Sequence, residues 1–511
     1  MRRKDLLALA LLGALLFGWS LGTRDFWEPD EPDFALISRE MLQSGDWIVP
    51  TRNGVRYAEK PPLLYWMVAG LAKATGTGIN GWTARLPSAF CAVVTALALY
   101  LAGCRWLSRA AGLTSAVVLM TMPLWWWSGR WLMTDMPFAC LVSLAMIGLA
   151  RPLLEERAPA WWGFVFLGLA VLAKGPLAGA LVVAGLGMAG LLLCRNPLRF
   201  PLRWIAGGFL VLAVAAPWYW LVYRQAGKGF LLEVLWRQNF RAVETESHAH
   251  GPLYYLPNLR ALFPWVLPFL AAIPMAWKSR REKPALGLVL GWALGMLVLL
   301  SIPRVKQAKY LLPMLPGAAL LAGWAMEECL ALKRWTAQIT MGVLAVLAGA
   351  LLACAWLLPE QRSTCLGLAV AAATCAASLV WTQATGPALA SFCLAAASLA
   401  LPVADRFKSA RPLAEAAVLR AERRTLAYYG DDLQAAYPYY ADRRLDYIDA
   451  NEGGGHRLEI YFRAHPDALV LMRLRDYKRL SEWNPALLVT LGTPLSRKVG
   501  GKDVVAAELV R

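Results

Sequence analysis

The chain has 511 residues, of which 58% are hydrophobic and 17% charged, and its mean hydropathy is +0.45. Soluble domains carry about 25% charged residues, so the composition excludes an ordinary soluble protein and predicts a polytopic α-helical membrane protein. The net charge of +18 would suggest a nucleic-acid partner in a soluble protein. Here much of that charge lies in short loops between apolar runs, where it reports orientation, and no stripe of basic and aromatic residues accompanies it. Nucleic acid is therefore excluded as a partner.

The first apolar run, Leu6–Gly22, follows the basic residues Arg2, Arg3 and Lys4. This start resembles a signal peptide, but the small-residue cleavage pattern is weak and further apolar runs follow, so we expect an uncleaved first helix. The nine cysteines lie in or beside apolar runs without CxxC spacing. They are typical of small buried hydrophobic residues and predict no disulfide framework.

Apolar runs long enough to cross roughly 30 Å of hydrocarbon recur about thirteen times along the chain. They lie near residues 6–22, 85–104, 110–128, 134–150, 160–174, 176–194, 204–222, 261–278, 284–302, 310–327, 337–358, 364–382 and 386–403. The runs 160–174 and 176–194 are separated only by Lys174-Gly175-Pro176, so they are either two spans or one broken element. We assign residues 1–403 to a membrane domain.

Alternate loops between these runs are basic, which predicts the orientation of the chain. With the N-terminus in the cytoplasm, the opposite face carries residues 23–84, 129–134, 223–260, 303–309 and everything after about 404. Two of these outer loops, Lys228 to Arg260 and Arg304 to Lys309, are basic as well. Basic residues on the outer side need a reason, and an anionic ligand would supply one.

The first outer loop is predicted to contain two amphipathic helices at the membrane surface. After Asp30, the apolar residues Phe34, Ile37 and Met41 recur with helical spacing. Pro61-Pro62 precede a second helix, predicted over Leu63 to Lys73.

The tail, residues 404–511, has mixed charges and shorter periodicity. Pro412 to Arg423 reads as a helix, and short strands are predicted at Arg457 to Phe462, Ala468 to Met472 and Leu487 to Leu491. We expect a small soluble α/β domain on the outer face.

The first outer loop also holds a carboxylate cluster, Asp30-Glu31-Pro32-Asp33. Asp30 would suit a helix N-cap, Pro32 a first turn, and Asp33 the positive end of the helix dipole, so capping alone could explain the cluster. Glu59-Lys60 lie in the same loop, and Asp135 begins a later span. Charged groups beside a membrane are costly, so this set indicates a functional site.

The pattern of this loop resembles one family: the bacterial lipid A aminoarabinose transferases and their relatives, the protein O-mannosyltransferases, of the GT-C superfamily. The residues that carry the resemblance are Trp27-Glu28-Pro29-Asp30-Glu31, Ile37-Ser38-Arg39-Glu40-Met41, Ser44-Gly45-Asp46-Trp47-Ile48-Val49-Pro50, Asn53-Gly54, Tyr57-Ala58-Glu59-Lys60-Pro61-Pro62 and Arg85-Leu86-Pro87-Ser88. Beyond residue 90 it thins to Arg130 and Asp135, Lys174-Gly175-Pro176, Tyr254-Tyr255, Pro264-Trp265 and Lys309-Tyr310-Leu311-Leu312-Pro313. It implies a GT-C fold whose residues 23–84 form a periplasmic loop with active-site residues, a periplasmic tail at 404–511, and a place in the bacterial inner membrane.

The resemblance also implies an activity: inverting transfer of a sugar, aminoarabinose-like or a hexose, from an undecaprenyl-phosphate carrier to a periplasmic acceptor. Asp30 aligns with the family's catalytic carboxylate, which takes the proton of the acceptor hydroxyl. Glu31 and Asp135 would orient the acceptor or tune that carboxylate. The leaving phosphate needs fixed cations rather than a general acid. Lys60 aligns with the family's phosphate-contacting lysine.

Further residues are expected to support the two substrates. The donor phosphate would also be contacted by Arg130, Arg304, Lys306 and Lys309, and the substrates by Asp33, Tyr57, Glu59, Lys174, Tyr254 and Tyr255. The family usually has Arg-Tyr where this chain has Asp33 and Phe34. That change does not affect the predicted reaction type, but it leaves the identity of the sugar and of the acceptor open. Lipid A or a related glycolipid is the preferred acceptor, and protein Ser/Thr hydroxyls are the alternative.

No cofactor beyond the lipid-linked donor is expected, and a divalent metal ion has only weak candidate ligands in Glu59, His248 and His250. The stretch Glu244 to His250 is interpreted instead as a flexible loop over the site. Lys174 could equally be a lysine extending to the membrane surface from the end of a span. A transporter or flippase of a lipid-linked sugar is the alternative of another class, but the two halves of the chain do not resemble each other as transporter repeats do.

Overall fold

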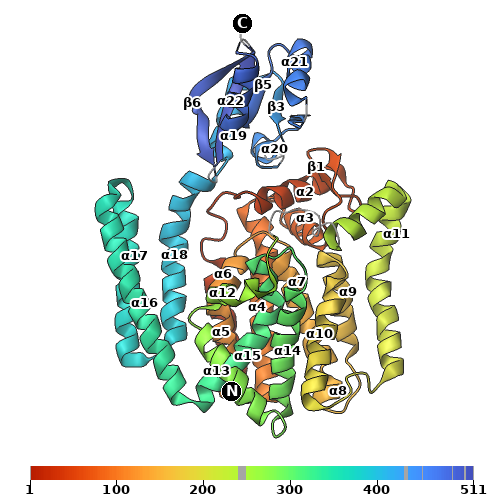
Figure 1. Cartoon of the computed structure of the whole chain (residues 1–511), viewed down its shortest axis with the longest axis vertical. Helices are drawn as coiled ribbons and strands as arrows, with labels where there is room; N and C mark the ends of the chain where they lie inside the picture. The colour runs from red at the N-terminus through yellow and green to blue at the C-terminus, as the bar shows by residue number, and fades with distance from the viewer. Residues whose placement is uncertain are drawn as a thin grey trace. The chain divides into compact units, whose positions relative to one another are not determined.

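The computed structural model describes residues 2–239, 249–430, 435–451, 453–485, 487–499 and 502–509 (Figure 1). The chain forms two compact units. Unit 1 comprises Met1–Leu21, Ala58–Leu64 and Arg85–Ala400, and unit 2 comprises Gly22–Tyr57, Tyr65–Ala84 and Leu401–Arg511.

Most helices lie in unit 1, and the predicted apolar runs fall on them. The elements along this part of the chain are α1 (Arg2–Gly18), α4 (Gly81–Trp106), α5 (Arg109–Thr121), α6 (Pro123–Gly129), α7 (Asp135–Leu149), α8 (Arg151–Leu154), α9 (Trp161–Lys174), α10 (Leu177–Leu193), α11 (Pro201–Asn239), η2 (Pro252–Tyr254), α12 (Tyr255–Asn258), η3 (Leu259–Leu262), α13 (Val266–Ser279), α14 (Pro284–Ser301), η4 (Ala308–Met314), α15 (Leu315–Glu328), α16 (Leu330–Leu357), η5 (Pro359–Gln361), α17 (Arg362–Thr382) and α18 (Thr385–Lys408). Within the described residues, seven helices are long and apolar enough to cross a membrane, or nine if each of two bent pairs is one span. The polytopic membrane class is confirmed.

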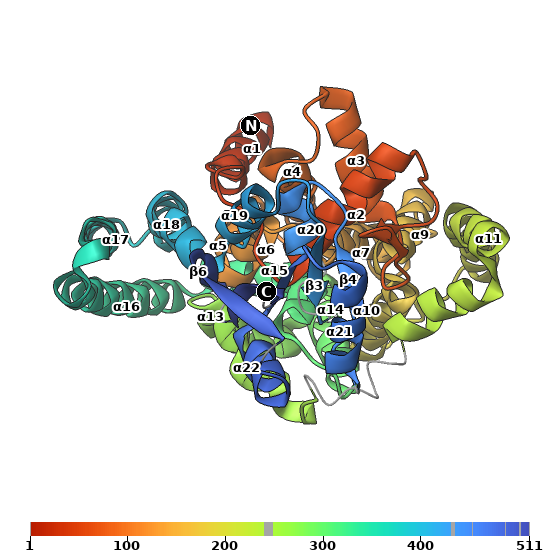
Figure 2. The same ribbon diagram turned by 90° about the horizontal axis from the view of Figure 1, so that it is seen from above.

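The core of unit 1 is built by close helix pairs. α16 and α17 lie side by side in both Figure 1 and Figure 2. α15 is buried along almost its whole length, and α10 packs on α14. A Cβ atom at Gly291 would lie 2.4 Å from Ala189, so the absence of a side chain lets these two backbones approach. Small residues serve this purpose at helix contacts in membranes, where no hydrophobic force draws helices together.

The structure separates the runs 160–174 and 176–194 into two helices, α9 and α10. Gly175 between them has φ 88°, a conformation that favours glycine, and Pro176 stands at the N-cap of α10. The outer segment predicted from residue 223 is helical up to Asn239, because α11 continues to that residue through a kink at Gly227. An apolar run in the sequence predicts where a membrane span lies, but it does not predict the residue at which the helix ends.

Unit 2 contains both helices predicted in the first outer loop. α2 (Asp30–Ser44) buries Phe34, Ile37 and Met41, and α3 runs over Leu63–Thr75. Between them, β1 (Thr51–Arg52) and β2 (Val55–Arg56) form a hairpin. Its turn is Asn53-Gly54, with φ 53° and 78°, the residue pair that two-residue hairpin turns prefer.

The tail of unit 2 carries a five-stranded sheet in the order β4-β3-β5-β7-β6. The strands are β3 (Leu426–Tyr429), β4 (Asp446–Ile448), β5 (Leu469–Arg473), β6 (Leu488–Val499) and β7 (Lys502–Leu509), and the helices are α19 (Arg411–Ala421), α20 (Ala436–Ala441), α21 (Gly454–Ala464) and α22 (Leu474–Trp483). β3 is parallel to β4 and β5, while β7 is antiparallel to β5 and β6. α19 and α20 pack on one face of the sheet, and α21 and α22 on the other.

Three of the four elements predicted in the tail are present, and one is wrong. The helix at Pro412 to Arg423 and the strands at Ala468 to Met472 and Leu487 to Leu491 correspond to α19, β5 and the start of β6. The strand predicted at Arg457 to Phe462 is instead part of α21. Leu458 and Phe462, four residues apart, are the buried apolar residues of that helix, which is helical spacing rather than strand alternation.

Candidate functional site

Unit 1 contains a cavity of about 220 Å³ at the ends of several of its elements. Lys60, Asp135 and Lys174 line its polar part. Lys60 lies in the loop before α3, Asp135 is the first residue of α7, and Lys174 is the last residue of α9. Because Asp135 and Lys174 stand at helix ends, their side chains extend beyond the packed helices and meet Lys60 in the cavity.

The charges in this cavity are coupled. Lys174 Nζ is ion-paired with Asp135 Oδ1, and it also lies 4.4 Å from the centre of the Tyr310 ring. Burial lowers the pKa of Lys60. The positive charges of Lys174 and Lys309 lower this pKa further, whereas the negative charges of Asp135 and Glu59 oppose the shift. Of the charged residues that line the cavity, Lys60 and Lys174 are positive and Asp135 is negative, which leaves one positive charge in excess. Such a site favours an anion, because each added negative charge relieves the repulsion among the lysines.

The remaining wall of the cavity is apolar. It is formed by Phe138, Leu177, Leu181, Leu299, Leu300, Ile302, Pro303, Val305, Tyr310 and Pro313. A cationic end and a hydrocarbon wall in one cavity suit a molecule with an anionic head and an apolar chain.

In unit 2, Asp30 begins α2, and its neighbour Glu31 is held in a buried ion pair. Arg24 donates two hydrogen bonds to Glu31, at 2.5 and 2.9 Å, and the backbone N–H of Trp27 donates a third at 3.1 Å. Glu31 is fully buried. Its carboxylate thus ties the segment before α2 to the first turn of the helix and positions Asp30.

Capping explains less of the carboxylate cluster than the sequence suggests. Pro29, not Asp30, occupies the N-cap position of α2, and no side chain caps the helix there. Pro32 and Asp33 do lie in the first turn. Asp33 is ion-paired with Arg52 at 3.2 Å, and Arg52 in turn lies 5.1 Å from the centre of the Tyr57 ring.

The ion pair of Arg24 and Glu31 gives a first prediction. Glu31→Gln leaves a buried guanidinium without its counter-charge, so we expect a loss of about 3–5 kcal/mol in stability, measured by thermal unfolding of the purified protein in detergent. Arg52→Gln removes a cation from the more exposed pair with Asp33 and should cost less than about 1 kcal/mol. Equal unfolding temperatures for Glu31→Gln and wild type would show that Glu31 does not hold this segment.

Other basic candidates are bonded to carbonyl groups. Arg130 donates to the carbonyls of Leu16 and Trp19, at 2.9 and 2.7 Å, and so satisfies the C-terminal end of α1. Lys306 is buried, which lowers its pKa, and it donates to the carbonyl of His250 at 3.0 Å. These contacts give both residues a structural task. Neither lines the cavity, and their predicted phosphate contacts stay predictions.

The remaining candidates lie in two segments, residues 249–255 and residues 303–309. Arg304 is exposed, and its carbonyl accepts from the backbone N–H of His250. His250 is stacked on Tyr254, and Tyr254 meets the buried Tyr255 edge to face. His248 lies outside the described residues, as does most of the loop from Glu244. Among the residues that are described, no group of three His, Cys, Asp or Glu side chains could hold a metal ion.

Two residues in contact with the candidate site residues were not predicted from the sequence. Tyr310 covers the Lys174 ammonium group, and its position next to Lys309 in the motif was the available signal. Arg24 gave no signal, because a single arginine at the end of an apolar run is normally read as an orientation charge.

Comparison with known families places these observations in context. Residues 59–220 match the family model described as dolichyl-phosphate-mannose-protein mannosyltransferase. The undecaprenyl phosphate-alpha-4-amino-4-deoxy-L-arabinose arabinosyl transferase of Yersinia enterocolitica is 30% identical over 320 residues, which cover 60% of this chain and 56% of that protein. Its counterpart from Pectobacterium carotovorum is 31% identical over 318 residues, with the same coverage. The chain thus spans 56% of the length of these curated relatives.

Solved structures share the fold over nearly the whole chain. ArnT from Cupriavidus metallidurans bound to undecaprenyl phosphate has a TM-score of 0.76 at 23% identity, covering 98% of this chain and 97% of that one. The archaeal oligosaccharyltransferase AglB from Archaeoglobus fulgidus has a TM-score of 0.59 at 11% identity, covering 94% and 71%. At such identities the likeness concerns the fold, and it confirms the predicted GT-C architecture.

Proposed function

We propose that this chain, a relative of the undecaprenyl-phosphate aminoarabinose transferases of the GT-C superfamily, is an inverting glycosyltransferase. It moves a sugar from an undecaprenyl-phosphate carrier to an acceptor hydroxyl. The observation that carries the proposal is the cavity of unit 1, where the cationic group of Lys60 and Lys174 adjoins an apolar wall. A polyprenyl-phosphate sugar has the matching chemistry, an anionic head on a hydrocarbon chain.

The chemistry follows from the residue types. A bond forms between the acceptor oxygen and the anomeric carbon as the bond from that carbon to the phosphate oxygen breaks. The acceptor proton passes to Asp30, whose assignment rests on the sequence motif. The carrier departs as a phosphate monoester, already a stable anion, and the fixed charges of Lys60, Lys174 and Lys309 stabilise the negative charge that grows on it. Asp135 holds Lys174 in place through their ion pair.

For the acceptor we propose lipid A or a related glycolipid, as the aminoarabinose transferases imply. A second candidate, a Ser/Thr hydroxyl of a protein, is favoured by the match of residues 59–220 to the protein mannosyltransferase model. Asp33 stands where the family usually has an arginine, and it is ion-paired with Arg52, so this neighbourhood is expected to select the sugar or acceptor.

The cellular setting belongs to the same proposal. We place the chain in the bacterial inner membrane with about thirteen spans, since one or two helices overlap each predicted run. The N-terminus is cytoplasmic, and residues 23–84 and 404–511 are periplasmic, as the basic loops indicate.

A transfer assay tests the function. The full chain is reconstituted in lipid nanodiscs with undecaprenyl-phosphate aminoarabinose and lipid A, and the products are analysed by mass spectrometry. We expect lipid A to gain one aminoarabinose. A gain on a Ser/Thr peptide with an undecaprenyl-phosphate hexose instead would support the second candidate. No transfer to either, together with movement of the donor across liposomes that lack acceptor, would contradict the proposal and favour a flippase.

A further inference from the structure

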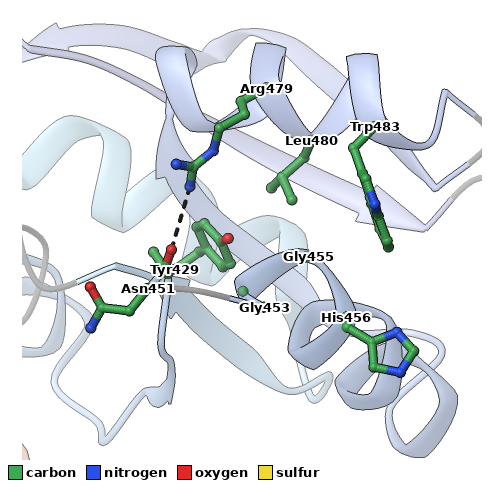
Figure 3. A pocket seen from close by; sticks show the side chains of 10 residues that line it. Tyr429, Asn451, Gly453, Gly455, His456, Arg479, Leu480 and Trp483 are labelled. Carbon is green, nitrogen blue, oxygen red and sulfur yellow. Dashed lines mark hydrogen bonds between the residues drawn. The ribbon is translucent and has the colours of Figure 1, made fainter.

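The tail of unit 2 contains a second cavity, of about 500 Å³, that the transfer reaction does not use. It lies between the start of α21, the helix α22 and the end of β3 (Figure 3). Its lining consists of Tyr429, Ala450, Asn451, Gly453, Gly454, Gly455, His456, Arg479, Leu480 and Trp483.

The position of this cavity in the sheet is one that ligands favour. β3, β4 and β5 are parallel, with β3 between the other two. The connection from β3 passes over one face through α20, whereas those that follow β4 and β5 pass over the other through α21 and α22. In open α/β sheets, ligands bind outside the carboxyl ends of the strands where such connections diverge.

The cavity offers positive charge and backbone donors. Arg479 points to its rim, donating to the carbonyl of Ala450 at 3.4 Å and lying 3.7 Å from Asp476. Both contacts are long, so the guanidinium retains capacity for an anion. The first turn of α21 has no side-chain cap, and its N-cap Gly453 has φ 80°. The backbone N–H of Gly454 already donates to the carbonyl of Asn451 at 2.7 Å. The next N–H groups of the first turn lack an acceptor within the helix, and together with the positive end of the helix dipole they favour an anion. Among the described residues that line the cavity, none is acidic.

A buried hydroxyl supplies an independent sign of a missing ligand group. Tyr429 is 1% exposed, and its hydroxyl has no hydrogen-bond partner of acceptable geometry among the described residues, although the side chain of Arg479 lies close to it. Figure 3 shows this hydroxyl directed into the space between Leu480 and Gly455. Burial raises its pKa, and the nearby Arg479 opposes the shift. A buried polar atom without a partner is destabilising, so a ligand group that bonds this hydroxyl would gain affinity from doing so.

The opposite wall is aromatic. Trp483 is 52% exposed, and its ring lies over the first turn of α21, where a Cβ atom on Gly455 would come within 3.1 Å of it. An exposed indole face beside polar groups suits the C–H face of a sugar ring. We propose that this cavity binds a phosphorylated saccharide, with the phosphate on Arg479 and the first turn of α21 and the ring on Trp483.

Calorimetric titration of the full chain in detergent tests this site, with glucosamine 1-phosphate as the probe. We expect binding, and we expect Arg479→Gln to weaken it about tenfold, the usual effect of losing one charge-assisted hydrogen bond. Arg475→Gln is the matched control: Arg475 lies on the same helix and is ion-paired with the same Asp476, but it does not line the cavity. Its affinity should equal that of wild type.

Further arms distinguish the alternatives. Glucosamine without phosphate, and inorganic phosphate alone, should each bind more weakly than the probe. Equal binding of either one, or an equal loss in Arg475→Gln, would overturn the proposal, as would the absence of binding to wild type. The titration is repeated in Lys60→Gln, which disables the cavity of unit 1. Binding that persists there supports the tail site even if the proposed transfer fails, whereas binding lost there would assign the probe to unit 1.

Discussion

Asp30→Asn is expected to abolish sugar transfer, lowering kcat by about 10²–10⁴-fold, the range that a general base contributes. An amide cannot accept the proton of the attacking hydroxyl, so the nucleophile stays weak. Because Asn has the size of Asp, and because the ion pair of Arg24 and Glu31 holds the start of α2, the fold should be retained. The measurement is the initial rate of product formation at saturating donor and acceptor.

Two controls accompany this variant. Undecaprenyl phosphate should bind Asp30→Asn as it binds wild type, because the lysines of unit 1 are unchanged. Asp442→Asn removes an exposed carboxylate from the same unit and should leave the rate unaltered. Turnover of Asp30→Asn at the wild-type rate would remove Asp30 as the base.

Lys60→Gln is expected to lower kcat by about 10²–10³-fold, comparable to the loss of one preorganised donor aimed at developing charge. The carrier phosphate gains charge as its bond to the sugar breaks, and a half-buried ammonium group stabilises that charge more than water would. Donor affinity should fall as well. Lys283→Gln, which removes an exposed lysine paired with Glu328, should change neither parameter. Unchanged turnover in Lys60→Gln would exclude Lys60 from the phosphate site.

The pH dependence of donor binding sharpens this test. Only protonated Lys60 attracts the phosphate, and burial, followed by Lys174, lowers its pKa below the ordinary 10.5. Donor affinity should therefore decline as the pH rises through that lowered pKa, before an ordinary lysine would titrate. An arginine keeps its proton beyond pH 12. In Lys60→Arg the decline should move to higher pH, and an identical profile in both proteins would assign the titration to another group.

The fold was largely predictable because apolar runs of membrane length leave a chain few alternatives. The ends of elements were less predictable. α11 continues to Asn239 because its helix outlasts its apolar run. The sequence of α21 resembles a strand because the helix is short and begins within a run of three glycines. Local composition at such places is compatible with several structures, and packing on the sheet decides among them.

The site was predictable as a set of residues and not as an arrangement. Lys60, Asp135, Lys174 and Lys309 come from four distant segments, and only the fold shows that they share one electrostatic neighbourhood. Sequence could not distinguish them from Arg130, whose guanidinium group is bonded to the end of α1. In the sequence, a basic residue of the site cannot be told from a basic residue that binds carbonyl groups, because the partners of both lie far along the chain.

The single surplus positive charge of the unit 1 cavity also bears on the order of events in a catalytic cycle. A phosphodiester carries one negative charge, whereas the phosphate monoester freed by transfer carries about 1.5 to 2 near pH 7. In the proposed reaction the spent carrier would thus be held more strongly than the incoming one, so free undecaprenyl phosphate should compete with the donor for this cavity. An enzyme of this kind is slowed by its own product, so the membrane must recycle the bare lipid phosphate to keep it running.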